Sequence, residues 1–242
     1  MIAAQAAAET RHLLRNGEQL LLTLIIPLLL LAAFSLEPLV SFGAGISRID
    51  FMTPGVMALA VMSTAFTSQA IATGFERRYG VLKRLGATPL SRGGLIAAKT
   101  GTVVAVELLQ GALIDVVALI IGWRPHASVA AIVVVPLLIG LGTAAFSGLA
   151  LAMAGTLRAE ATLAAANLVY IVLLGVGGVI FPLTKFPAGA RHLFELAPTG
   201  ALSTGLRSVL AHHVPFPVGN TVTLLVWAVA AIAVASRVFR WE

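Results

Sequence analysis

Three polar side chains interrupt a long apolar segment of the sequence, and they are the residues best placed to do chemistry there. Glu107, Gln110 and Asp115 fall within the run from Thr100 to Ile121. If this run is an α-helix, Glu107 lies about 12 Å beyond Lys99 and Asp115 about 24 Å beyond it, and the two acids point about 80° apart. Both can therefore face one broad surface of the helix. Such groups could carry protons, line a substrate path, or form structural hydrogen bonds to a neighbouring helix.

Other kinds of site lack a complete set of residues. The segment 93–100 approaches a phosphate-binding loop, but Ala98 stands where a glycine is needed before the lysine, and no strand precedes it. Ser147, in a run of small residues, suggests an intramembrane serine protease, yet all five histidines fall outside the apolar segments. His212 and His213 would point apart on a helix and have no carboxylate near them. We expect no catalytic residue and no metal site in this chain.

The composition is that of an integral membrane protein. Hydrophobic residues make up 59% of the chain and charged residues 11%, whereas soluble proteins average about 25% charged residues. The net charge of +6 does not indicate nucleic acid, because the basic residues lie between apolar runs and form no face interleaved with aromatics. Anionic membrane lipids and a cytoplasmic protein partner are the expected counterparts. The absence of cysteine excludes disulfides and thiol chemistry.

Six apolar segments are long enough to be transmembrane helices. They are residues 20–36, 52–73, 100–121, 129–154, 162–181 and 218–238. Residues 2–16 are too polar to cross and predict a short surface helix. An even number of spans places both termini on one side, and that side carries eleven lysines and arginines against five opposite. We therefore predict an all-α membrane protein, a single domain over residues 1–242, with both termini in the cytoplasm.

The loop of residues 75–99 is the one substantial polar connection, and it holds six of the sixteen basic residues. Its apolar side chains recur at spacings of four, three and three: Phe75, Tyr79, Leu82 and Leu85. This spacing predicts a short helix over residues 75–85, which Thr88 and Pro89 would end. A solvated loop gains nothing from an aligned apolar face, so we favour a helix that docks in a protein groove or on the membrane surface.

The same loop resembles the coupling loop of type-2 ABC transporter permeases, a group that includes drug, lipid and glycan exporters. Residues 76–85, then 88–92 and Lys99, are similar to the Glu-Arg, Gly-x-Leu, Leu-x-x-Thr-Pro and Lys pattern of that family. The resemblance implies that residues 75–92 form a coupling helix on an ATPase subunit. The ATPase-coupling residues it implies are Phe75, Glu76, Arg77, Tyr79, Gly80, Leu82, Arg84, Leu85, Thr88 and Pro89.

A second likeness covers the segment 182–217, which is too broken by proline to be an ordinary span. It is similar to the proline series after the fifth span of these permeases, with Ala197 in place of the usual asparagine. The resemblance implies re-entrant helices at the outer mouth, and apolar stretches at 193–196 and 201–210 predict where they lie. The residues that mark this outer segment are Pro182, Pro187, Pro198 and Arg207.

The resemblance implies the membrane subunit of an ATP-driven exporter in a bacterial cell membrane. Its expected partners are a separate ATPase, which would bind ATP and magnesium, and a second permease subunit, identical or related. The chain itself would bind no cofactor. Candidates for the translocation path are Glu107, Gln110, Asp115 and Gln69. The alternative is an ion-coupled secondary transporter that uses Glu107 and Asp115 as proton carriers, and the motifs leave drug, lipid and glycan substrates open.

Overall fold

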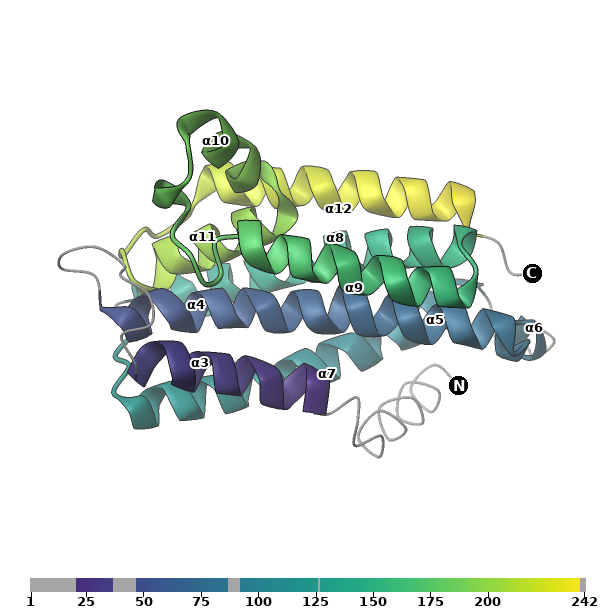
Figure 1. Cartoon of the computed structure of the whole chain (residues 1–242), viewed down its shortest axis with the longest axis horizontal. Coiled ribbons are helices and arrows are strands. Elements are labelled where there is room, and N and C mark those ends of the chain that lie inside the picture. The colour runs from purple at the N-terminus through teal and green to yellow at the C-terminus, as the bar shows by residue number, and fades with distance from the viewer. Residues whose placement is uncertain (1–20, 37–46, 87–91, 126, 240–242) are drawn as a thin grey trace.

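A computed structural model describes residues 21–36, 47–86, 92–125 and 127–239, and this part of the chain is helical with short connections (Figure 1). The α-helices are α3 (Ile26–Leu36), α4 (Arg48–Val61), α5 (Gln69–Arg78), α6 (Val81–Gly86), α7 (Arg92–Ile121), α8 (Ala131–Thr156), α9 (Ala159–Val176), α10 (Ala188–Leu196), α11 (Pro198–Leu210) and α12 (Val218–Val238). Two π-helical segments, η1 (Leu21–Ile25) and η2 (Met62–Ser68), and a 3₁₀ turn, η3 (Leu183–Lys185), complete the set.

Five helices of the described chain are long and apolar enough to cross a membrane. They are Arg48–Arg78, Lys99–Ile121, Ala131–Thr156, Ala159–Val176 and Val218–Val238. These correspond to the second to sixth predicted spans. For the predicted span 20–36, the structure has the shorter apolar helix Thr23–Leu36, which packs against α4 and α7. Five of the six predicted spans thus coincide with helices that are candidate membrane spans, and the first stays a prediction. The predicted surface helix at 2–16 lies outside the described residues.

The second span extends at both ends and the fifth stops early. The helix predicted over 52–73 runs from Arg48 to Arg78 as α4, η2 and α5 in succession. The span predicted to reach residue 181 ends instead at Val176. Gly177 and Gly178 follow it, and Gly178 has a φ of 68°. Because that left-handed conformation cannot continue an α-helix, the chain leaves the helix there.

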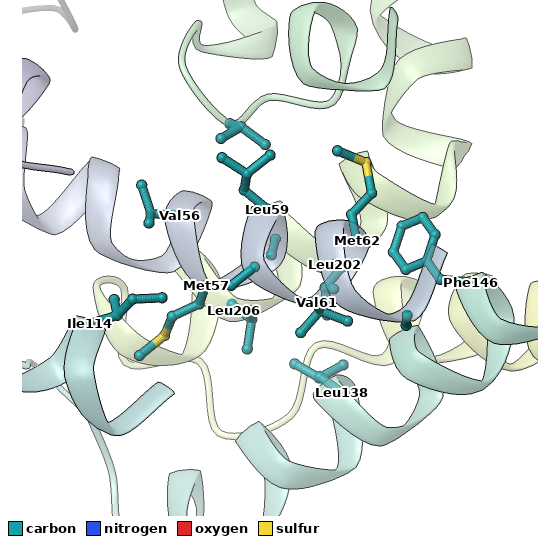
Figure 2. Packing of buried hydrophobic residues seen from close by; sticks show 14 of the residues in the cluster. Val56, Met57, Leu59, Val61, Met62, Ile114, Leu138, Phe146, Leu202 and Leu206 are labelled. Atoms are coloured by element: carbon teal, nitrogen blue, oxygen red, sulfur yellow. The ribbon is translucent and has the colours of Figure 1, made fainter. Parts of the chain in front are cut away.

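The continuous helix of α4, η2 and α5 is the centre of the bundle. It contacts α3, α7, α8, α9 and α11, and α4 is buried from Phe51 to Val61. Apolar side chains occur all around α4, which is the pattern of a helix covered on every side. Figure 2 shows side chains of α4 facing residues of α7, α8 and α11, among them Ile114, Leu138 and Leu202.

Small residues allow α8 and α12 to pack closely. A Cβ atom at Gly148 would stand only 2.7 Å from the backbone carbon of Ala231, and one at Gly155 only 2.8 Å from the Cα of Phe239. Since neither position has room for a side chain, the backbones of the two helices approach directly, as glycine and alanine permit between membrane helices.

The proline-rich segment after α9 forms the two predicted short helices, α10 and α11. Pro198 begins α11, where a missing N–H costs nothing. α11 is buried over most of its length and packs against α4, α8 and α12. In Figure 1, α10 and α11 lie towards one end of the bundle, and α6 lies at the other. α6 and the proline-rich segment therefore belong to opposite ends.

The single helix predicted over residues 75–85 is wrong. α5 ends at Arg78, and α6 begins only at Val81. Between them Gly80 adopts a φ of 67°, a left-handed conformation that glycine enters without strain and that ends a helix. The apolar spacing read across this turn is therefore divided between two helices.

Candidate functional site

Arg77 ties the end of α5 to the end of α8. Its Nη1 donates a hydrogen bond of 2.9 Å to the carbonyl of Ala154, and its Nη2 donates one of 2.9 Å to the carbonyl of Leu157. α8 ends at Thr156, so these carbonyls belong to its last turn and the residue after it, where the helix itself supplies no donor. The cationic fork also faces the negative end of the helix dipole. Arg77 thus caps α8 from the side.

Two ion pairs attach the same end of α5 to further helices. Lys99 Nζ of α7 lies 2.6 Å from Glu76 Oε2, with the lysine side chain 9% exposed. Arg78 pairs with Glu160 in the first turn of α9, and both of these side chains are about half exposed or more. Together with Arg77, these contacts connect the last turn of α5 to α7, α8 and α9.

Aromatic and basic groups lie at the end of α5, in the turn that follows it and on α6. Phe75 and Tyr79 stack with ring centroids 6.0 Å apart, and Tyr79 is 64% exposed. Arg84 of α6 reaches back to donate a 3.3 Å hydrogen bond to the Tyr79 carbonyl. The predicted coupling residues therefore form two groups. Glu76 and Arg77 bind neighbouring helices, whereas Tyr79 and Arg84 face outward.

Some predicted coupling residues lie beyond what the structure describes. Thr88 and Pro89 are outside the described residues, and the side chains of Leu82 and Leu85 are not described. Their role in docking stays a prediction.

The polar groups of α7 lie against α4, η2 and α8. Glu107 is 9% exposed, and its Oε2 accepts a hydrogen bond of 2.7 Å from Thr143 of α8. Gln110 is more deeply buried. Its Oε1 accepts a 2.8 Å hydrogen bond from Thr64 of η2, and its Nε2 donates to the carbonyl of Thr23.

A cavity of about 430 Å³ opens between α4, α7 and α8. Glu107, Gln110 and Asp115 all line it, so the structure brings together three of the four predicted path residues. Gln69 is buried but does not line this cavity. Among the described residues, neither Glu107 Oε1 nor Asp115 Oδ1 has a hydrogen-bond partner.

Arg207 is buried at the α10–α11 end of the bundle. Its Nε donates to the carbonyl of Phe51 at 3.2 Å and its Nη2 to that of Gly178 at 3.0 Å. The guanidinium lies 3.7 Å from the centroid of the Phe51 ring. A Cβ atom on Gly55 would stand 3.0 Å from Arg207 Nη2, so only glycine leaves room for this side chain. Arg207 thus joins α11 to the start of α4 and to the turn after α9.

The predicted prolines of the outer segment have different surroundings. Pro182 is buried, Pro187 is exposed and precedes α10, and Pro198 is buried at the start of α11. The short α10 is held by Trp227 of α12, whose indole N–H donates a 2.8 Å hydrogen bond to the carbonyl of Leu196.

In the part of the chain that the structure describes, no group of three or more acids and histidines could hold a metal ion.

Thr143, Thr64 and Glu160 take part in these contacts without a signal of their own in the sequence. Threonines within apolar segments usually bond to their own helix, and Thr143 does so too, at 2.9 Å from the Ile139 carbonyl. Such a threonine can be recognised as the partner of an acid only when the structure shows a buried acid facing it from a neighbouring helix. The pairing of Glu160 with Arg78 depends on how α5 meets α9, which no local pattern of residues shows.

In this arrangement the end of α5 is connected to three long apolar helices, and the short helices α10 and α11 lie towards the other end of the bundle. It agrees with a comparison against known families. The family model described as ABC-2 type transporter matches residues 2–211, most of the chain. The chain belongs to the ABC-2 type transporter family. ABC-2 permeases typically pair with ATPase subunits, and their membrane domain lacks an ATPase site. A comparison with individual curated proteins gave no match.

As an ABC-2 permease, the protein is a multi-pass membrane component. Its two candidate functional regions are the contacts of Glu76, Arg77 and Arg78 at the end of α5 and the cavity between α4, α7 and α8. They use different surfaces of the same bundle. α7 joins them, because Lys99 contacts Glu76 and, eight residues later, Glu107 faces the cavity.

Proposed function

We propose that this ABC-2 permease is the membrane subunit of an ATP-driven exporter of a hydrophobic or amphipathic substrate. A separate ATPase would dock on the turn at Tyr79 and on α6, and a second permease subunit would complete the path. The α6 end of the bundle would then face the cytoplasm, as the distribution of basic residues predicts.

The observation that supports this proposal most strongly is the attachment of the α5 end to three other helices. Glu76 pairs with Lys99 of α7, Arg77 binds the end of α8, and Arg78 pairs with Glu160 of α9. A force applied to α6 would therefore act on α5 and, through these contacts, on α7, α8 and α9. A loop without such contacts would bend instead and would not move the helices. Such a connection suits a subunit that is moved by a separate ATPase, because helices connected by packed interfaces shift together.

The experiment is co-purification with a candidate ATPase, ideally one encoded beside this chain. We expect a variant with both Leu82→Asp and Leu85→Asp to insert in the membrane but to lose the ATPase, because a docked apolar face cannot bury carboxylates. The matched control is Leu193→Asp on α10, a leucine that is 67% exposed at the other end of the bundle. Retention of the ATPase by the double variant, with full transport, would contradict the proposed docking.

The ion-coupled alternative predicts a different result. A secondary transporter that uses Glu107 and Asp115 as proton carriers would move substrate without an ATPase, driven by a proton gradient alone. Under the proposed function, the permease alone moves nothing under such a gradient, and ATP with the partner is required.

A further inference from the structure

The cavity between α4, α7 and α8 has the size and composition of a ligand site. Its volume of about 430 Å³ is within the usual range for small-molecule pockets. The lining residues come from α4, α7 and α8, and the polar ones among those described are Glu107, Gln110, Asp115 and Thr143. Most of the lining side chains are apolar, so the site suits a ligand with a hydrophobic body.

The charge of this lining has one sign. It contains two acids, Glu107 and Asp115, and the described residues that line the cavity include no lysine, arginine or histidine. An acid at membrane depth costs several kcal/mol unless it finds a partner, water or a proton. A cationic ligand would relieve this cost, whereas an anionic ligand would find no cationic partner among the described lining residues.

The acids of α7 differ from its buried amide in how their polar atoms are partnered. Gln110 uses both ends of its side-chain amide, towards Thr64 and towards the Thr23 carbonyl. Glu107, one turn away, uses only one oxygen on Thr143, and its Oε1 has no partner among the described residues. The buried Oδ1 of Asp115 also has none there. A residue kept only for helix packing would resemble Gln110, with its polar atoms satisfied.

We infer that this cavity binds an amphipathic or lipophilic cation, with its positive group held by Glu107 or Asp115 and its apolar body against α4 and α8. The two acids lie eight residues apart on α7, about 12 Å along the helix axis, and so provide two successive positions for one positive group. This inference rests on the proposed function, since it names the class of substrate that the exporter would carry.

The test is binding of tetraphenylphosphonium to the permease–ATPase complex in lipid nanodiscs. Tetraphenylborate, with nearly the same shape and the opposite charge, is the matched probe, and binding to protein-free nanodiscs is subtracted for both. We expect saturable binding of the cation at least about tenfold tighter than that of the anion. We expect Glu107→Gln to weaken cation binding about tenfold, equivalent to about 1.4 kcal/mol. The control is Glu195→Gln, which alters a partly exposed acid of α10 outside the cavity.

A second variant blocks the cavity without touching an acid. Gly111 lines the cavity, and a Cβ atom there would meet nothing within 4 Å. Gly111→Leu should therefore fold normally and fill the space, and we expect it to weaken cation binding as strongly as Glu107→Gln does. Equal binding of the two probes, or unchanged cation binding in both variants, would overturn the inference.

ATPase association and ATP hydrolysis are measured on the same preparations. A complex that assembles and hydrolyses ATP but does not discriminate the cation rejects the cation site and leaves the proposed function standing. A permease that recruits no ATPase rejects the proposed function, and the cation site is then judged by binding to the permease alone.

Discussion

Adjacent arginines at the end of α5 should differ sharply in their contributions to stability. Arg77 makes two charge-assisted hydrogen bonds of 2.9 Å to carbonyls at the end of α8. Each such bond contributes about 1.5 to 3 kcal/mol where water is excluded. Since one of the two bonds is exposed and water can replace it, we expect Arg77→Ala to lower the free energy of unfolding by about 2 to 4 kcal/mol. Arg77→Lys should recover part of this loss, because an ammonium group lacks the fork that binds two carbonyls together.

Arg78 supplies the matched control. Its ion pair with Glu160 joins side chains that are 50% and 61% exposed, and exposed pairs contribute about 0 to 1 kcal/mol. Arg78→Ala should therefore change the free energy of unfolding by no more than about 1 kcal/mol.

The assay is equilibrium unfolding of the purified permease in mixed micelles, followed by circular dichroism. We also expect Arg77→Ala to raise the ATP hydrolysed per substrate moved, because α8 would no longer follow α5. Equal destabilisation by the two alanine variants would refute the assignment of Arg77 as the cap of α8. Unchanged coupling in Arg77→Ala would refute its role in transmission.

Three further predictions test other contacts. Arg207→Met should lower the free energy of unfolding by about 2 to 4 kcal/mol in the same assay, since two buried carbonyls and an aromatic face lose their cation. Gly148→Leu should lower the free energy of unfolding by at least about 1 to 3 kcal/mol, because it would separate α8 from α12. The backbone carbon of Ala231 in α12 stands only 2.7 Å from the position of the new Cβ atom. Reversing one charge of the Glu76–Lys99 pair should reduce transport, and reversing both should restore more than half of it, as a double-mutant cycle would reveal.

Much of the fold could be predicted because apolar length and proline position are local signals. The five long helices follow from runs of apolar residues, and α10 and α11 follow from short apolar stretches between prolines. The prediction of one helix over residues 75–85 failed because the spacing of the apolar residues continues across Gly80, whereas the left-handed backbone conformation of Gly80 ends the helix there. Periodicity predicts which residues could share a helical face, but one residue in the left-handed conformation divides them between two helices.

The candidate cavity could be predicted only on the α7 side. Glu107, Gln110 and Asp115 were visible as polar residues in an apolar helix, and all three line the cavity. Their partners were not visible, because Thr143 and Thr64 belong to other helices whose rotation is set by packing. Gln69 lies on the helix that also supplies part of the cavity wall, yet it is not among the lining residues. The π-helical segment η2 lies between Gln69 and the cavity residues Ala60 and Val61. Because a π-helix does not follow the α-helical spacing, the side chains after η2 point in other directions than an uninterrupted α-helix would predict.

The most direct test of the central proposal is transport by reconstituted vesicles of defined composition. Vesicles containing the permease and its ATPase should move substrate when ATP is supplied, and vesicles containing the permease alone should move no more than protein-free vesicles under an imposed proton gradient. The substrate probe is tetraphenylphosphonium, with a hydrophobic dye as a second cargo so that the result does not depend on the cation site. Gradient-driven movement by the permease alone, lost in Glu107→Gln, would contradict the account and favour an ion-coupled carrier.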